Sequence, residues 1–130
     1  MLTILLASAL ATGAEAPNQQ PDLAAANGWV RLIDAQHWND SWTAAGTLFK
    51  SQMPEARWTS TIAPVREPLG AVLSRALTGV TKSKSLPGVP DGDYEVVQYK
   101  TSFAHKAAAT ETVVLSNEVN GWKVDGYFIR

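Results

Sequence analysis

The chain has 130 residues, enough for one domain with a sizeable hydrophobic core. It contains no cysteine, which excludes disulfides, zinc–thiolate sites and thiol catalysis, and its balance of 45% hydrophobic and 18% charged residues is typical of a globular protein rather than a disordered one. The formal net charge is −1 and no cluster of lysines and arginines occurs, which argues against nucleic acid as a partner.

The first 16 residues have the pattern of a secretory signal peptide. The apolar run LTILLASALA is followed by small residues, and either Thr12-Gly13-Ala14 or Ala14-Glu15-Ala16 suits a cleavage site. No Lys or Arg precedes the run, so either the amino terminus alone supplies the positive charge or the true start lies upstream. The alternative is a frayed apolar tail on a cytosolic protein. We expect a signal peptide over residues 1–16 and a polar linker over residues 17–21.

This signal predicts a periplasmic or secreted protein. The apolar run is too short to span a bilayer. No cysteine follows it to carry a lipid. We therefore expect no membrane anchor after cleavage.

Three helices are predicted in the first half of the chain. The first covers residues 22–35, where Pro21 suits the first turn. Its apolar residues recur at helical spacing: Leu23, Ala26, Val30 and Ile33. The third begins after Pro54 and is short or kinked at Pro64, which lacks a backbone donor. Its apolar face consists of Trp58, Ile62, Val65 and Leu69.

The second predicted helix carries an aromatic stripe. Its apolar residues lie on one helical face: Trp38, Trp42, Ala45 and Phe49. Such a stripe either packs in the core or lines part of a cavity. Core packing is the favoured interpretation, because aromatic stripes at helical spacing are usually core.

The second half of the chain has strand patterns. Residues 71–81 are ambiguous, because a short apolar run fits a helix or a strand equally well. Residues 82–93 form a loop by composition. Residues 94–103 alternate as a strand, with one face formed by Val97, Tyr99, Thr101 and Phe103. The segment AHKAAA then turns the chain into another strand that begins near Thr110.

The clearest turn signal is Asn120-Gly121, which favours a two-residue hairpin loop with positive φ. This register places Val119 opposite Trp122 and Glu111 opposite Arg130. It gives an apolar inner face formed by Val113, Leu115, Trp122, Val124 and Phe128. The outer face then carries Val114, Tyr127 and Ile129. A slip of one residue would turn the apolar set outward, so the pattern supports this register.

These elements predict an α+β fold in which N-terminal helices pack on one face of an antiparallel sheet. No internal repeat or second domain is visible, so residues 22–130 are expected to form a single domain.

Several spaced residues also resemble a bacterial family, the domain of unknown function 4019. The resemblance covers about residues 23–130 and rests on many small features. Two are spaced motifs in the helical half: D-x3-W-x3-W, formed by Asp34, Trp38 and Trp42, and W-x7-R-x-P-x-G, formed by Trp58, Arg66, Pro68 and Gly70. The others follow in the strand half: Arg75, LPGVPDGDY, the run from Tyr99 to Phe103, Glu111-Thr112 and the closing GWKVDGYFI. Trp38 stands where the family pattern has Tyr, which removes a hydroxyl there.

The resemblance implies a cystatin-like or nuclear-transport-factor-two-like fold. In that fold a curved antiparallel sheet wraps N-terminal helices and can form a cone-shaped pocket. It also implies that residues 71–81 are a strand, in which Arg75 shares a face with Leu73 and Leu77.

The candidate site is a polar group on the concave face of this sheet. Its members are Arg75, Tyr99, Glu111 and Arg130, and Trp38 and Trp42 are further pocket candidates. A charged pair on an apolar face must be paired or must line a wet cavity. The group is therefore either a structural ion pair with a core tyrosine, which we favour, or the polar floor of a site for an acidic or hydroxylated ligand.

A second group, Asp34, His37 and Asp40, lies near the junction of the first two helices. The group is either an acid/base pair or, as we favour, helix capping and solvated surface, because Asp is favoured at helix starts. Arg66 either suits a helix end or ties the third helix to the sheet. No nucleophile elbow, phosphate-binding glycine loop or metal-spaced histidine pair is present, so no cofactor is expected.

Three functional hypotheses follow. The favoured one is an exported, non-catalytic module that binds a small molecule or a protein partner. The alternative is an isomerase- or dehydratase-like enzyme; the fold resemblance implies Glu111 as the base and Tyr99 as the donor. The third is a homodimer through the outer sheet face, with Val114, Tyr127 and Ile129 buried between subunits.

Overall fold

The computed structural model describes residues 20–130; the predicted signal peptide and most of the predicted linker lie outside the described residues. Helices come first and an antiparallel sheet follows, as the sequence predicts. The elements are α1 (Pro21–Asp34), α2 (Trp38–Ala44), α3 (Thr47–Gln52), α4 (Glu55–Arg66), the 3-10 turn η2 (Glu67–Leu69), β1 (Val72–Ser83), β2 (Tyr94–Phe103), β3 (Lys106–Glu118) and β4 (Gly121–Ile129).

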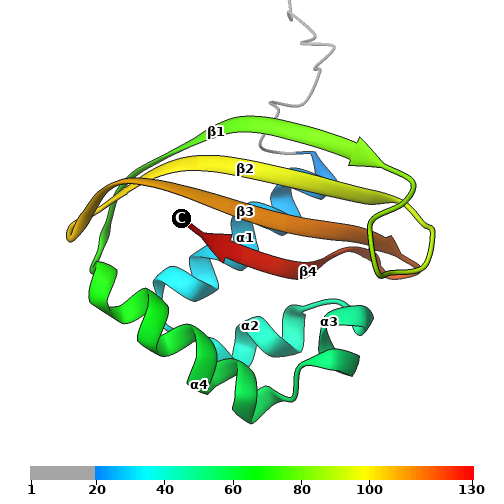
Figure 1. Ribbon diagram of the computed structural model, residues 1–130, viewed down its shortest axis with the longest axis horizontal. Helices are drawn as coiled ribbons and strands as arrows, with labels where there is room; N and C mark the ends of the chain where they lie inside the picture. The colour runs from blue at the N-terminus through cyan, green and yellow to red at the C-terminus, as the bar shows by residue number, and fades with distance from the viewer. Residues whose placement is uncertain (1–19) are drawn as a thin grey trace, which may run out of the picture.

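The four strands pair in the order β1-β2-β3-β4, and the sheet does not close into a barrel. It arches over α1, while α2 and α4 lie below (Figure 1). The fold is therefore α+β with the helices N-terminal to the sheet. Within residues 20–130, no helix is long and apolar enough to cross a membrane.

The core lies between α1 and the inner face of the sheet. Its central side chains are almost completely buried: Ala26, Ile33, Val97, Val113 and Leu115. The Trp29 ring on α1 contacts the Tyr127 ring edge to face, with centroids 5.3 Å apart, and lies tilted against the Trp58 ring at 6.0 Å, which joins α1 to β4 and α4. The predicted faces of the first helix and of β2 are both confirmed by this burial.

The predicted second helix is two helices, α2 and α3, with a break at Ala45-Gly46. Both residues adopt extended backbone angles. The Gly46 amide donates to the Val124 carbonyl at 2.7 Å. A Cβ on Gly46 would overlap the Asp125 carboxylate and lie 2.7 Å from Glu118 Oε2. The break therefore lets the backbone approach β4 more closely than a side chain would allow.

The strand boundaries confirm two expectations and correct two. Residues 72–81 of the segment that was ambiguous by pattern belong to strand β1, and β2 spans residues 94–103 as predicted. The strand β1 continues through Lys82 and Ser83, which were expected in the loop. However, β3 begins at Lys106 rather than near Thr110, because the turn before it consists of only Ala104 and His105. In β1, Leu73 lies at a register shift and is 68% exposed, so it does not share the partly buried environment of Arg75.

The register predicted for the last hairpin is wrong. The turn residues are Val119 and Asn120, and Gly121 begins β4 with φ of +107°. Glu118 consequently lies opposite Gly121. This shifts the pairing by two residues from the prediction, and a bulge at Asp125 reverses one of them, so that Val113 lies opposite Tyr127 instead of Phe128.

The bulge changes which side chains of β4 face the core. Tyr127, expected outside, is 8% exposed and packs in the core, whereas Phe128, expected inside, is 59% exposed. Ile129 lies opposite Glu111 and also packs against the core. Two of the three residues proposed for an outer dimer face, Tyr127 and Ile129, therefore belong to the inner side of the sheet.

Candidate functional site

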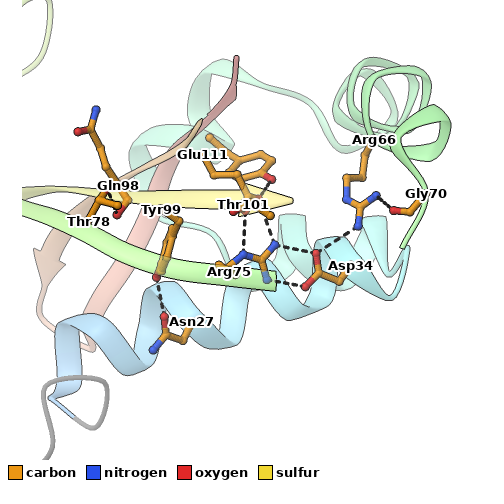
Figure 2. A network of polar contacts seen from close by, with 11 residues as sticks. Asn27, Asp34, Arg66, Gly70, Arg75, Thr78, Gln98, Tyr99, Thr101 and Glu111 are labelled. Atoms are coloured by element: carbon orange, nitrogen blue, oxygen red, sulfur yellow. Dashed lines mark hydrogen bonds and ion pairs between the residues drawn. The ribbon is translucent and has the colours of Figure 1, made fainter. Parts of the chain in front are cut away.

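Arg75 on β1 is the centre of a polar network that joins α1 to the sheet (Figure 2). Its Nε donates to Glu111 Oε1 at 2.7 Å and its Nη2 donates to Glu111 Oε2 at 3.2 Å. On the other side, Nη1 and Nη2 donate to the two carboxylate oxygens of Asp34 at 2.7 and 2.9 Å. One guanidinium thus links the last residue of α1 to β3 by two forked contacts, the geometry that arginine favours.

Glu111 has no exposed surface and is fully engaged. Besides Arg75, the hydroxyl of Thr101 donates to Oε1 (Figure 2). The hydroxyl of Tyr127 donates to Oε2. Burial raises the pKa of Tyr127, and the adjacent Glu111 charge raises it further. Burial lowers the pKa of Arg75, but the ion pairs with Asp34 and Glu111 outweigh this effect and raise it.

Asp34 also binds Arg66, which corrects the interpretation of Asp34 as a helix cap. Arg66 Nη2 lies 3.4 Å from Asp34 Oδ1, and Nη1 donates to the Gly70 carbonyl at 2.5 Å. The guanidinium also lies 4.5 Å above the Phe103 ring. Arg66 therefore ties α4 to the sheet and to α1, one of the two roles expected for it.

His37 and Asp40 lie apart from this network. They form a 3.8 Å contact on the surface, with side chains 57% and 72% exposed. The solvated-surface interpretation fits these two residues.

Tyr99 and Arg130, the other members of the predicted group, have separate positions. The Tyr99 hydroxyl donates to Asn27 Oδ1 at 2.6 Å, and burial raises the Tyr99 pKa to about 12. Arg130 is exposed, and its backbone pairs with Thr110. The shifted turn and the β4 bulge together leave Glu111 opposite Ile129 instead of Arg130. The expected Glu111–Arg130 pair is therefore wrong, and the expected Glu111–Arg75 pair is present.

This geometry supports a structural role for the network. Two arginines and two carboxylates balance in charge, and the oxygens of Glu111 accept from Arg75, Thr101 and Tyr127. A carboxylate held in this way, without exposure to solvent, has no lone pair directed at a bound molecule. The arrangement thus gives Glu111 no contact through which it would act as a base.

The predicted pocket residues Trp38 and Trp42 pack against the core as partly buried side chains. Trp42 donates its indole N–H to the Met53 carbonyl at 2.7 Å. Neither residue meets the Arg75 network. Most of the aromatic stripe is thus packing, the interpretation that its helical spacing favoured, but Phe49 also lines a cleft described below.

A small polar cleft opens beside the network, between α1 and β1. It has a volume of about 340 Å³ and is lined by Asn27, Val30, Arg31, Arg75, Leu77 and Tyr99. Only Arg75 and Tyr99 of the predicted site residues reach it. It combines two cationic side chains with a phenol and an amide.

A larger apolar cleft, which we call the α3 cleft, lies on the opposite face of the sheet. Its volume is about 390 Å³. Its walls come from α3, from the β1–β2 loop and from three strands: Leu48, Phe49, Gln52, Met53, Leu86, Pro87, Val89, Tyr94, Val114, Asp125, Gly126 and Phe128. Sequence reasoning missed this cleft because Phe128 was placed on the inner face.

Asp125 is the one carboxyl group of the α3 cleft. It accepts hydrogen bonds from the Ser116 hydroxyl and from the Phe49 backbone amide, the latter at 3.4 Å. Burial raises its pKa, against the lowering effect of these hydrogen bonds. The cleft therefore has apolar walls and one weakly acidic polar group, a composition common in sites for small molecules.

Among residues 20–130, no three histidine, aspartate or glutamate side chains are grouped so as to hold a metal ion. Residues 25–127 match the model of a protein family described as protein of unknown function (DUF4019). A search of curated proteins finds no significant match.

Proposed function

The chain belongs to the DUF4019 family of proteins of unknown function, and we propose that it is an exported, non-catalytic module that binds a small apolar molecule in the α3 cleft. The observation that carries this proposal is the composition of the cleft. Side chains from three separate parts of the chain converge on one volume of about 390 Å³, and most of them are apolar. Small-molecule sites typically have this size and character.

Phe128 gives the cleft an open apolar wall. Its ring is 59% exposed, although it stands next to the buried Tyr127. Gly126 has no side chain, and a Cβ there would lie 3.3 Å from the Phe128 ring and 3.5 Å from Val114. The glycine thus keeps free the space between two apolar walls.

Export is supported by the apolar run in residues 2–11 and by the small residues after it. A binding module needs no catalytic group, and the buried, fully engaged Glu111 agrees with that. The apolar walls would also accept an apolar side chain of a protein partner. We favour a small molecule as the occupant, because the cleft has the volume that is typical of small-molecule sites.

A second candidate is a site for an acidic or hydroxylated molecule in the polar cleft between α1 and β1. The observation that favours it is the exposed Arg31 beside Arg75 and the Tyr99 hydroxyl. The charge of Arg75 is already neutralised by Asp34 and Glu111, so Arg31 would be the main cation. Loss of binding of an acidic probe in Arg31→Gln would identify this site.

The α3 cleft is tested with N-phenyl-1-naphthylamine, an uncharged fluorescent probe. We expect saturable binding by the protein and at least a severalfold weaker affinity in Phe128→Ser, because the loss of one apolar wall removes about 1–3 kcal/mol of burial. Val114→Gln is expected to have the same effect from the other wall.

Leu73→Ser is the matched control, because Leu73 is also a largely exposed apolar residue on a strand, at 68%, and does not line the cleft. Equal binding by Phe128→Ser, Leu73→Ser and the unchanged protein would contradict the proposal. So would an absence of saturable binding by the unchanged protein.

A further inference from the structure

Asn120 and Gly121 lie at the tip of the β3–β4 hairpin, outside the α3 cleft and outside the polar cleft beside Arg75. The neighbouring turn residue Val119 is fully exposed, and Asn120 is exposed as well. Gly121 has φ of +107°, and a Cβ at this position would meet no atom within 4 Å. The Asn120-Gly121 peptide bond therefore stands in solvent.

An asparagine that precedes a glycine carries its own reaction partner. The backbone nitrogen of the following residue is close enough to attack the side-chain carbonyl carbon and to close a succinimide ring. A side chain on the following residue would hinder this approach, and glycine has none. Asparagine is accordingly one of the heat-labile residues of proteins. Whether a given Asn-Gly pair reacts in a folded protein then depends on its surroundings.

The chain contains a second Asn-Gly pair, Asn27-Gly28, in the middle of α1. A helix holds each interior amide in a hydrogen bond to the carbonyl four residues earlier, which restrains the Gly28 nitrogen. Asn27 Oδ1 accepts from the Tyr99 hydroxyl at 2.6 Å, which holds the side-chain carbonyl against β2. Ala26 and Trp29 on either side of the pair are buried in the core, so a reaction there requires α1 to open locally. The two pairs thus have the same chemistry and opposite surroundings.

We propose that Asn120 is a site of spontaneous modification, at which the folded protein converts asparagine into aspartate and isoaspartate, and that Asn27 is protected from this reaction. The Gly121 amide nitrogen loses its proton and attacks Cγ of Asn120. The N–Cγ bond forms, the Cγ–Nδ2 bond breaks, and the leaving nitrogen takes up a proton and departs as ammonia. Water then opens the succinimide: cleavage of the bond to Cγ gives aspartate, and cleavage of the bond to the backbone carbonyl carbon gives isoaspartate. Water is the only co-reactant, and nothing is oxidised or reduced.

The reaction adds charge beside a contact that anchors α3. Glu118, in the same hairpin, accepts hydrogen bonds from the Thr47 amide at 2.8 Å and from the Thr47 hydroxyl at 2.7 Å. Asn120, Glu118 and Thr47 line a hollow of about 570 Å³ together with Asp91 and Asp93. Either product adds one negative charge to this acidic rim, and isoaspartate also adds a methylene group to the backbone of the turn. The proposal is independent of any ligand in the α3 cleft.

The test incubates the folded, full-length chain at mildly alkaline pH and maps it by mass spectrometry after digestion with pepsin in acid, which halts the reaction. The peptide that contains Asn120 should gain the mass of an NH2-to-OH exchange and separate into two forms. We expect the reaction at Asn120 to be about tenfold or more faster than at Asn27, because Asn27 reacts only when α1 opens. Isoaspartate from Asp91-Gly92 would leave the mass unchanged, so the mass identifies the asparagine product.

Incubation in guanidinium chloride is the matched control, because it removes the fold and leaves the two Asn-Gly pairs chemically alike. Both should then react at similar rates. Asn120→Ser keeps a residue that turns favour, and the acidic form that isoelectric focusing detects in the aged, folded protein should be absent from this variant. The proposal would be overturned by equal rates at Asn27 and Asn120 in the folded protein, or by no reaction at Asn120 under conditions in which the unfolded chain reacts. Persistence of the acidic form in Asn120→Ser would overturn it as well.

Discussion

Arg75 and Glu111 form a two-point ion pair inside the protein, with Nε–Oε1 at 2.7 Å and Nη2–Oε2 at 3.2 Å. The Arg75 side chain is 14% exposed and that of Glu111 is not exposed. Taking two charges out of water is costly. The attraction between them offsets this desolvation cost only if the geometry is good and the remaining lone pairs accept hydrogen bonds. Thr101, Tyr127 and Asp34 meet that condition here.

Removal of the Glu111 charge should therefore destabilise the fold strongly. We expect Glu111→Gln to lower the free energy of unfolding by about 3–5 kcal/mol, the cost of breaking a buried pair from one side. Urea unfolding followed by tryptophan fluorescence measures it. Glu67→Gln, which changes an exposed glutamate, should stay within about 0.5 kcal/mol. A similar small effect in both variants would show that the pair contributes little.

The two inward tyrosines should differ in their sensitivity to loss of the hydroxyl. Tyr127→Phe removes a donor to the buried Glu111 carboxylate, whereas Tyr99→Phe removes a donor to the neutral Asn27 side chain. Hydrogen bonds to charged groups are stronger, so we expect losses of about 2 kcal/mol for Tyr127→Phe and about 1 kcal/mol for Tyr99→Phe. Thermal unfolding of both variants checks the order, and a larger loss for Tyr99→Phe would contradict it.

Local patterns were sufficient to predict most of the elements. Alternation predicted the bounds of β2 and its inward face, and helical spacing predicted α1. The resemblance added that residues 71–81 are a strand, and the pairing of Arg75 with Glu111 was one of two ion pairs considered. These features depend on residues near in sequence or on one face of a strand.

The turn of the last hairpin and the start of β3 were misplaced locally, whereas two further errors arise where distant segments meet. The β4 bulge lies at Asp125, whose carboxylate accepts from the Phe49 amide, 76 positions away. No turn rule predicts that contact, and the bulge alone moved Tyr127 inward and Phe128 outward. Asp34 was assigned as a cap for the same reason, since its partner Arg75 lies 41 positions away.

The buried carboxyl group of Glu95 was missed although the sequence contained a signal for it. Alternation on β2 puts residues 97, 99, 101 and 103 inside, and Glu95 falls two positions before the first of them. An acidic residue at an inward position is itself unusual, because glutamate is rarely buried without a partner. The sequence does not predict its hydrogen bond with Asp22, because that contact depends on how α1 packs on the sheet.

Two glycines should respond to alanine in opposite directions. Gly46→Ala would place a Cβ against Asp125 and Glu118, so we expect a loss of about 1–3 kcal/mol from the overpacking. Gly28 lies on α1 with open space around its Cβ position, and Gly28→Ala should stabilise the protein by about 0.5–1 kcal/mol. Chemical unfolding measures both changes. A neutral Gly46→Ala would show that α3 moves readily away from β4.

The Glu95 carboxyl group should make stability depend on pH. Burial raises its pKa to about 7 in the folded protein, and the hydrogen bond to Asp22 adds to this effect. The pKa is near 4.5 when the chain is unfolded, so between these values only the folded state holds the proton. The free energy of unfolding should therefore fall as pH rises from 4.5 to 7, by at most about 1.4 kcal/mol per pH unit from this group, and the contribution is lost above pH 7. Asp22, whose pKa is lowered from 3.8, acts in the opposite direction and in a lower pH window, since its contribution to stability is lost as pH falls below that value.

Asp125 also has a raised pKa, so the measurement compares the pH profile of the unchanged protein with that of Glu95→Gln. We expect the difference between the two profiles to change across pH 4.5–7 and to be constant above it. Parallel profiles throughout that window would show that Glu95 is ionised in the folded protein.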